Sequence, residues 1–288
     1  MNFPMNVPLG KGVEMIVVWL TDNFGTVFDT LSVWIRFFLV NIDRLFNWVP
    51  WPITIIIVSI LAVLFSGRRM AIFSAFGLFL LGCMGLWAEG MSTMARVVTA
   101  VFISVLFGLP VGVLAAKDDK FESLLRPILD GMQTIPSFVY LVPAIMFFGI
   151  GAVPGVMATC IFSLPPMVRM TNLGIRQVNY EVVEAGHAFG STPWQLLLKI
   201  QLPLALPSIM AGVNQTVMMS LSMTVTAAMI GAGGLGDNIL YSIQRVDLKV
   251  GVDAGVGILL IAMILDRILQ GLTKRQQKSI HRRKHKTG

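Results

Sequence analysis

Long apolar runs dominate the pattern of hydrophobic and polar positions along the chain. A helix needs roughly 17 to 25 mostly apolar residues to cross a hydrocarbon layer about 30 Å thick. Seven runs fit this requirement: residues 51–67, 70–87, 95–116, 132–150, 154–172, 204–230 and 253–272. Their apolar residues are continuous rather than alternating, which disfavours a transmembrane β-barrel. The pattern therefore predicts an all-α integral membrane protein with about seven transmembrane helices.

The composition supports this class of protein. Hydrophobic residues make up 55% of the 288 positions, charged residues only 13%, and the mean hydropathy is +0.77. A soluble domain of this size could hardly cover its surface with so few charges. The two cysteines, Cys83 and Cys160, lie inside apolar runs, so we expect two small buried side chains and no disulfide.

The first fifty residues follow a different pattern. Between residues 29 and 48, apolar side chains such as Trp34, Phe37 and Leu45 are spaced among charges, as in a helix that lies in the membrane interface. An additional membrane span is the alternative, and it would place the N-terminus inside. We expect residues 1–50 to form an extracytoplasmic or interfacial N-terminal segment.

The distribution of positive charge predicts the orientation, because cytoplasmic loops are enriched in Lys and Arg. If the loop between the fifth and sixth runs is cytoplasmic, the inside receives the basic tail at residues 273–288 and Arg68, Arg69, Lys117, Lys120, Arg126, Arg169, Arg176 and Lys199. The outside receives Lys11, Arg36, Arg44, Arg96, Arg245 and Lys249. We therefore expect an outside N-terminus and a cytoplasmic C-terminus. The basic tail suits anionic membrane lipid better than nucleic acid.

The polar residues restrict how such a protein can be driven. All acidic residues fall in loops or near the ends of the runs, whereas proton-coupled carriers usually keep an ionisable group at membrane depth. Some sodium sites use only carbonyl and hydroxyl oxygens, so a stand-alone ion-coupled carrier or channel remains an alternative. Gly10-Lys11-Gly12 lacks the spacing of a phosphate-binding loop, and His187 has no metal-ligand set nearby. We expect no enzyme, no metal or cofactor on this chain, and ATP hydrolysis on another chain.

A short polar segment between the fifth and sixth runs has its own pattern. Residues 184–203 read EAGHAFGSTPWQLLLKIQLP. Asn179 is a good N-cap for one helix, and Gly190 suits the left-handed position just past its end. Thr192 can cap a second helix that begins at Pro193, and the final Leu-Pro pair marks the return to the membrane. Such an elbow can enter a groove on a soluble partner, or it can simply lie on the lipid.

The same segment resembles the signature of binding-protein-dependent ABC importer permeases. The matching residues are Glu184, Ala185, Gly190, Ile200, Leu202 and Pro203. Gly186 departs from the second alanine of the signature, which costs about 1 kcal/mol of helix propensity and is expected to leave the packing loose there. The resemblance implies that residues 179–203 form a cytoplasmic coupling helix that docks on a cytosolic ATPase subunit.

More of the chain resembles one branch of this family. Residues 130–151, 153–175, 211–236 and 266–272 are similar to permease subunits of bacterial glycine betaine and proline betaine importers. The resemblance implies the transmembrane domain of a type I ABC importer, with two membrane helices in residues 51–91 and a permease core in residues 92–272. Related permeases for choline, carnitine and similar amines have much the same sequence features, so these solutes remain alternatives.

The resemblance also implies the partners. These are a cytosolic ATPase that binds ATP and Mg²⁺, an extracytoplasmic substrate-binding protein, and a second permease chain that forms a homodimer with the first. The assembly would lie in the bacterial inner membrane.

Polar and aromatic residues within the runs are candidates for the transport path. They are Gln133, Thr134, Phe138, Tyr140, Asn214 and Gln215. Polar side chains at membrane depth either hold helices together or line water, and both interpretations stay open. Aromatic faces attract a quaternary ammonium by about 0.5 to 2 kcal/mol per contact. The glycine-rich residues 231–238 are expected to form a flexible gate or a docking turn for the binding protein.

Overall fold

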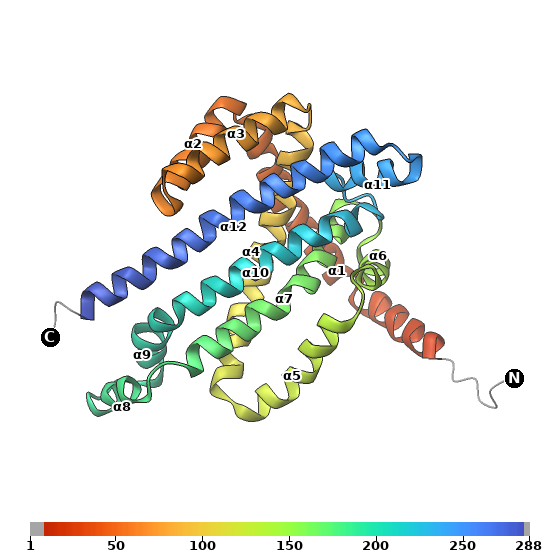
Figure 1. The fold of residues 1–288 in the computed structure, drawn as a ribbon. Coiled ribbons are helices and arrows are strands. Elements are labelled where there is room, and N and C mark those ends of the chain that lie inside the picture. Colours follow the sequence, from red (N-terminus) through yellow and green to blue (C-terminus); the bar gives the residue numbers. More distant parts are fainter. Residues whose placement is uncertain (1–8, 285–288) are drawn as a thin grey trace, which may run out of the picture.

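The chain folds into a bundle of helices, shown in Figure 1. The computed structural model describes residues 9–284, and every regular element in this range is helical. The elements are α1 (Leu9–Trp48), α2 (Trp51–Ser66), α3 (Arg68–Cys83), α4 (Trp87–Lys117), α5 (Asp119–Thr134), the 3₁₀ turn η1 (Ser137–Tyr140), α6 (Leu141–Phe148), α7 (Ala152–Arg176), α8 (Tyr180–Ala188), α9 (Pro193–Leu196), the π-helical η2 (Leu197–Gln201), α10 (Leu202–Ala228), α11 (Leu235–Arg245) and α12 (Leu248–Lys284). Residues 1–8 of the N-terminal segment and residues 285–288 of the basic tail lie outside the described part.

Helices α4, α7 and α10 form the centre of the bundle. Glycines let their backbones approach closely. A Cβ added to Gly112 of α4 would lie 2.8 Å from the carbonyl oxygen of Val168 in α7. A Cβ added to Gly212 of α10 would lie 2.8 Å from Cβ of Met170 in α7. Small residues serve this purpose in membranes, where lipid provides no hydrophobic drive for helix association and close packing must supply it.

Buried hydroxyl groups also join these three helices. The Ser220 hydroxyl of α10 donates to Ser163 Oγ of α7 at 3.1 Å, and Ser163 Oγ lies 3.3 Å from Ser104 Oγ of α4. All three serine side chains are fully buried. Because an unpaired hydroxyl in such a place would be costly, these bonds fix how the three helices are aligned along their length.

The number of possible membrane spans differs in part from the prediction of about seven. Five described helices are long and apolar enough to cross a membrane, or six if Asp119–Thr134 and Ser137–Phe148 count together as one bent span. The fourth apolar run is thus not a straight helix, because the chain bends by 110° between α5 and η1. Pro136 explains the bend, since the residue before a proline, here Ile135, is driven into an extended conformation.

The first two runs form the short helices α2 and α3. Each has 16 residues, a length of about 24 Å that falls short of a hydrocarbon core of about 30 Å. They fold back on one another at Gly67, whose φ of +94° is readily adopted only by glycine. The hairpin packs on α12, where Gly77 faces Leu260 and the Ser66 hydroxyl donates to the carbonyl oxygen of Arg267.

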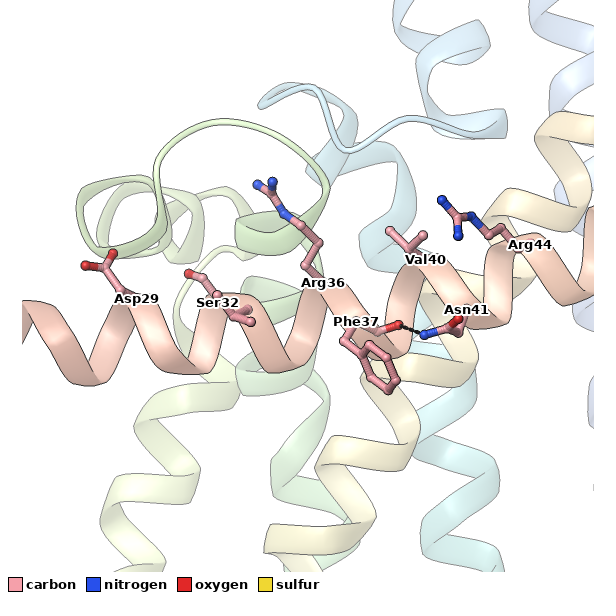
Figure 2. Close-up of a pocket in the computed structure, with 8 residues that line it drawn as sticks. Asp29, Ser32, Arg36, Phe37, Val40, Asn41 and Arg44 are labelled. Atoms are coloured by element: carbon pink, nitrogen blue, oxygen red, sulfur yellow. Dashed lines mark hydrogen bonds between the residues drawn. The ribbon is translucent and has the colours of Figure 1, made fainter.

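Helix α1 crosses one end of the bundle. Ile35 and Leu39 pack in a buried cluster with Val153 at the start of α7, and the Ser92 hydroxyl near the start of α4 donates to Asp43 at 2.6 Å. Figure 2 shows α1 running across its neighbours rather than alongside them. Its length and composition would also suit a membrane span. The crosswise course is therefore what favours an interfacial position for this helix.

The other end of the bundle carries α8 and α9. They follow the last turn of α7 and lead back into α10, and they project beyond the long helices in Figure 1. The Lys117 ammonium at the end of α4 lies 5.2 Å from the centre of the Trp194 ring in α9. The molecule thus has two distinct ends, with α1 and α11 at one and α8 and α9 at the other.

Alanine at Gly112 tests the close approach of α4 and α7. The added methyl group would lie 2.6 Å from Cβ of Thr171 as well as meeting the Val168 carbonyl, so α7 must shift. We expect a loss of about 1 to 3 kcal/mol of stability, seen as a lower midpoint of thermal unfolding in detergent. Gly255→Ala in α12 is the control, because nothing lies within 4 Å of its Cβ position. Equal midpoints would contradict the packing.

Candidate coupling site

The local structure of α8, the first helix of the candidate coupling segment (residues 179–203), follows the sequence prediction. The Asn179 side chain caps α8 by accepting from the Glu181 N–H at 2.9 Å. At the other end of α8, Gly190 has φ +76°. The Ser191 N–H donates to the Gly186 carbonyl oxygen at 3.1 Å, and the Gly190 N–H donates to the His187 carbonyl oxygen at 2.9 Å. This pair of bonds is a Schellman motif, which satisfies the last carbonyls of α8 and turns the chain sharply. The predicted cap and corner are confirmed.

The second helix begins as predicted but does not end where the sequence suggested. Thr192 and Gln195 form a capping box, with Pro193 in the first turn. From there α9, η2 and α10 continue as one helical stretch, Pro193–Ala228, so the second helix does not end before the Leu202-Pro203 pair.

A π turn explains why proline is tolerated inside this stretch. Pro203 has no N–H and its ring crowds the preceding turn of an α-helix. The Leu202 N–H donates to the carbonyl oxygen of Leu197, five residues back, which widens the helix just before the proline. The coupling segment is therefore joined to α10 without a loop.

Gly186 is the point where α8 meets α9 and η2. It is buried, and a Cβ added to it would lie 2.7 Å from Cδ1 of both Leu196 and Ile200. The prediction of loose packing at this glycine is thus wrong, because the side chains of Leu196 in α9 and Ile200 in η2 fill the space that a methyl group would occupy. Gly186 and Ile200 of the signature hold α8 against the start of the long helix.

The signature residues differ in how far their side chains are exposed. The exposed ones are Glu184, Ala185, Gly190 and Pro203, the buried one is Gly186, and the partly buried ones are Ile200 and Leu202. The largest exposed apolar side chains of the segment lie outside the signature: Phe189 is 90% exposed, Tyr180 70% and Trp194 68%. Phe189 and Tyr180 are not identified as site residues by the sequence reasoning. The sequence feature that could have identified Phe189 is its position directly before Gly190, the residue with the left-handed backbone between α8 and α9.

Two ion pairs connect the end of α7 with α5. Arg169 pairs with Asp130, and Arg176 Nη1 lies 2.6 Å from Asp119. Arg176 also donates to the carbonyl oxygen of Ala115 at 2.7 Å, which ties it to the end of α4. The acidic partners are well exposed, so each pair contributes about 0 to 1 kcal/mol. They orient α7 where it leads into the coupling segment.

The candidate path residues do not form one group. Gln133, Thr134 and Phe138 are exposed at the bend between α5 and η1, and Gln215 is exposed on α10. Tyr140 is buried, and its hydroxyl donates to the carbonyl oxygen of Met132, so its side chain is engaged within the chain.

Asn214 binds a carboxylate on the neighbouring helix. Its Nδ2 donates to Asp266 Oδ1 of α12 at 2.9 Å, and Gln270 Nε2 donates to both oxygens of the same carboxylate at 2.8 Å. Asn214 therefore holds α10 to α12. Asp266 thus lies in a contact between two helices and not in a loop.

The glycine-rich loop after α10 is anchored rather than free. The Leu235 N–H donates to Thr93 Oγ1 at 2.9 Å, and the Gly233 N–H donates to Asp237 at 3.1 Å. A Cβ on Gly233 would lie 2.5 Å from Nη2 of Arg96. The glycines are thus required for close approach to the Arg96 guanidinium, and these bonds argue against the expected flexible gate.

The two cysteines differ in their exposure. No group of three or more His, Cys, Asp or Glu side chains that could hold a metal occurs among the residues that the structure describes. Both cysteines are free, and Cys160 is buried as expected. Cys83 is exposed, because the buried stripe of α3 runs through Leu78 and Leu81 and leaves Cys83 outside it.

Sequence and structural relatives identify the family. A family model described as a binding-protein-dependent transport system inner membrane component matches residues 108–280. The chain is 43% identical to the glycine betaine/proline betaine transport system permease protein ProW of Escherichia coli (strain K12), covering 98% of this chain and 80% of that one. It is 44% identical to the glycine betaine transport system permease protein OpuAB of Bacillus subtilis (strain 168), covering 92% and 94%. The inward-facing MetNI methionine ABC transporter shares the fold, with TM-score 0.61 and 23% identity over 66% of this chain and 95% of that one.

These matches define the chain as a multi-pass permease subunit of the inner membrane, which is not an enzyme. More particularly, it belongs to the family of inner membrane components of binding-protein-dependent transport systems. A subunit of this family implies an ATPase and a binding protein as partners.

A double-mutant cycle tests the contact between Asn214 and Asp266. Asp266→Leu removes the acceptor and leaves two partly buried amides unpaired, which costs about 1 to 3 kcal/mol. We expect Asn214→Leu combined with Asp266→Leu to cost less than the sum of the single changes, by about 0.5 kcal/mol or more. Thermal unfolding in detergent measures all four proteins. Strict additivity would show that the two side chains do not interact.

Proposed function

We propose that this chain is the transmembrane permease of an ATP-driven importer for glycine betaine, proline betaine and similar osmolytes. The solute is inferred from relatives that are named for glycine betaine and match nearly the whole chain at 43% to 44% identity. The observation that carries the mechanism is the coupling segment. Helices α8 and α9 project from one end of the bundle in Figure 1, and Phe189 between them is 90% exposed.

The proposed partner at this end is the cytosolic ATPase, which would bind ATP and Mg²⁺. Glu184 is exposed and can pair with a basic residue of that subunit, while Ala185 and Gly190 permit close approach. Phe189 and Trp194 supply the kind of aromatic anchors that dominate protein interfaces. The ATPase must bind differently in the two transport states, because only differential contacts can shift the equilibrium between them.

The continuous helix from α9 into α10 suits the transmission of movement. Trp194 and Leu198 face outward at its beginning, and α10 packs along α7 for most of its length. A displacement of the coupling segment would therefore move α10 directly. Gly186 and Ile200 keep α8 attached to the same body.

The proposed orientation places the coupling segment in the cytoplasm. The ends of α2, α3, α4, the α5–α6 pair, α7, α10 and α12 then alternate across the membrane, which gives seven crossings. The N-terminal segment, residues 1–50, would lie outside and the basic tail, residues 273–288, inside. Residues 51–91 would add two membrane helices beside a permease core at residues 92–272.

The path is proposed to form between two copies of this chain. Exposed apolar side chains cover the bend from α5 to α6, including Phe138 and Val142, and such a surface fits a second chain. Gln133, Thr134 and Phe138 at this bend are the path residues that we retain, with Gln215. Tyr140 and Asn214 are engaged inside the chain, so we assign them to packing.

A second candidate solute is carnitine. The glycine betaine/carnitine transport permease protein GbuB of Listeria monocytogenes serotype 1/2a (strain 10403S) is 43% identical over 95% of this chain. The choline transport system permease protein OpuBB of Bacillus subtilis (strain 168) is 33% identical over 59% of this chain, which favours choline less.

Uptake by reconstituted vesicles tests the proposal. We expect glycine betaine uptake only when the ATPase, the binding protein and ATP are all present, with competition by proline betaine and weaker competition by choline. Uptake by this chain alone would overturn the subunit assignment. Preferential uptake of carnitine or choline would contradict the proposed solute but not the assignment as a permease of an ATP-driven importer.

Valine at Gly190 tests the corner of the coupling segment. Nothing lies within 4 Å of its Cβ position, so the effect comes from the left-handed backbone, which costs a β-branched residue about 1 to 2 kcal/mol or more. We expect Gly190→Val to insert normally and to lose uptake and coupled ATP hydrolysis. Gly190→Asn is the control, because asparagine tolerates this conformation. Normal uptake by the valine variant would refute the role of the corner.

Serine at Phe189 tests the docking contact itself. Because this ring is 90% exposed, the unfolding midpoint of the isolated chain should not change. Binding of the ATPase should weaken by about 2 kcal/mol or more, roughly thirtyfold, measured by titrating the ATPase against the chain in detergent. Val246→Ser, 89% exposed at the opposite end, should bind the ATPase normally. Unchanged affinity for the Phe189 variant would place the contact elsewhere.

A further inference from the structure

Arg96 is a half-buried cation on α4, one of the three central helices. Its Nε and Nη1 atoms are buried, and neither makes a hydrogen bond to another residue in the described part of the chain. Neither of the two ion pairs among the described residues includes Arg96. A buried N–H of a charged group is costly without a partner, so these two nitrogens require an explanation.

A small polar cavity adjoins Arg96 between α4, α7 and α10. Thr159 of α7 lines it together with Ser220 and Thr224 of α10, and Gly233 of the glycine-rich loop also borders it. The other lining residues are glycine, alanine or valine. One guanidinium group and three hydroxyl groups therefore surround the same space.

The three hydroxyl groups already use their hydrogens. The Thr159 hydroxyl donates to the Gly155 carbonyl oxygen at 2.7 Å. The Ser220 hydroxyl donates to Ser163 Oγ at 3.1 Å, and the Thr224 hydroxyl donates to the Ser220 carbonyl oxygen at 3.3 Å. Because a hydroxyl oxygen also has two lone pairs, each of these groups can still accept a hydrogen bond. The cavity thus offers donors from Arg96 and acceptors from α7 and α10.

The size of the cavity limits its occupant. It leaves about 10 Å³ for the centre of a water molecule. One buried water needs about 10 to 15 Å³ on this measure, together with two to four polar partners. A carboxylate or phosphate group has several heavy atoms and does not fit. The occupant is therefore a single water molecule or a monatomic ion.

The charges around Arg96 favour the neutral occupant. The carboxylates of Asp43 in α1 and Asp237 in α11 both act electrostatically on the guanidinium. Two negative charges thus face one positive charge before any occupant is added. A halide ion would add a third negative charge and be repelled by both carboxylates, whereas a water molecule is not.

We propose that this cavity binds one water molecule, which accepts from Arg96 and donates to hydroxyl oxygens of α7 and α10. A buried water makes about three hydrogen bonds, which matches the donors and acceptors present. The water joins α4 to α7 and α10. It also holds the guanidinium against the glycine-rich loop, where a Cβ on Gly233 would lie 2.5 Å from Nη2. The inference does not depend on the proposed function.

Valine at Thr224 tests the hydroxyl side of the site. Thr216→Val is the matched control, because Thr216 is buried on the same helix and donates to the carbonyl oxygen of Gly212 at 2.9 Å, but does not line the cavity. Both changes remove one hydroxyl, and only the change at Thr224 removes a partner of the water. The midpoint of thermal unfolding in detergent should be lower by about 2 °C or more for Thr224→Val than for Thr216→Val. Equal midpoints would contradict the site.

Coupling between Arg96 and Thr224 tests the bridge. Arg96→Met removes the donors of the water, so adding Thr224→Val to it should lower the midpoint by less than Thr224→Val does alone. Arg96→Met combined with Thr216→Val should be additive. The same additivity for both pairs would show that nothing joins Arg96 to Thr224.

Direct observation does not depend on the stability of any variant. A structure of the unaltered chain at a resolution that shows ordered water should contain a peak about 2.7 to 3.2 Å from a nitrogen of Arg96 and from at least one of the three hydroxyl oxygens. Absence of this peak would overturn the inference. An anomalous peak at the same position in crystals grown in bromide would also overturn it, because it would identify the occupant as a halide. No such peak in bromide, with the ordinary peak retained, is the expected result.

Discussion

The unbroken helix from Pro193 to Ala228 is the constraint on which the other features depend. A loop between the coupling segment and α10 would absorb movement, whereas a helix transmits it. The π turn ending at Leu202 makes this continuity compatible with Pro203, which would otherwise break or kink the helix. Gly186 completes the joint, because its missing side chain allows α8 to lie directly on Leu196 and Ile200. Helices α8 and α9 are thus joined to the membrane helix α10 without a loop between α9 and α10.

Movement of α10 reaches the rest of the bundle through close contacts. Gly212 brings α10 against α7, and the buried serines of α4, α7 and α10 are bonded in series. Closely packed interfaces of this kind change between discrete arrangements rather than deforming smoothly. Asn214 attaches α12 to α10 through Asp266, and α12 in turn carries the α2–α3 hairpin. In the proposed mechanism, these contacts would carry a displacement of α8 and α9 to the far end of the bundle, where the glycine-rich loop lies against Arg96.

The sequence predicts local structure where a residue type has a specific backbone role. Asn179, Gly190 and Thr192 occupy the caps and corner predicted for them, because capping depends on a few neighbouring atoms. Long apolar runs likewise predict α4, α7, α10 and α12. Features that depend on contacts distant in sequence are predicted poorly. Proline alone could not reveal that Pro203 sits inside a helix while Pro136 bends one, since neighbouring turns decide the outcome.

The same limit applies to the candidate site. The signature identifies the segment, but it does not separate Gly186, which is buried, from Glu184, which is exposed. Asn214 looks like a path residue until its partner Asp266 on another helix is known. The glycines of the 231–236 loop suggest flexibility until Arg96 is seen beneath them.

Cross-linking from position 189 tests the central claim most directly. In a chain with Cys83→Ser and Cys160→Ala, Phe189→Cys provides one thiol at the corner of the coupling segment. In the assembled transporter in membrane vesicles, this thiol should cross-link to the ATPase, with a yield that changes when ATP is bound. It should resist a membrane-impermeant thiol reagent added from outside. Labelling from outside, or no adduct with the ATPase in an active transporter, would contradict the claim that this segment transmits work from the ATPase to the bundle.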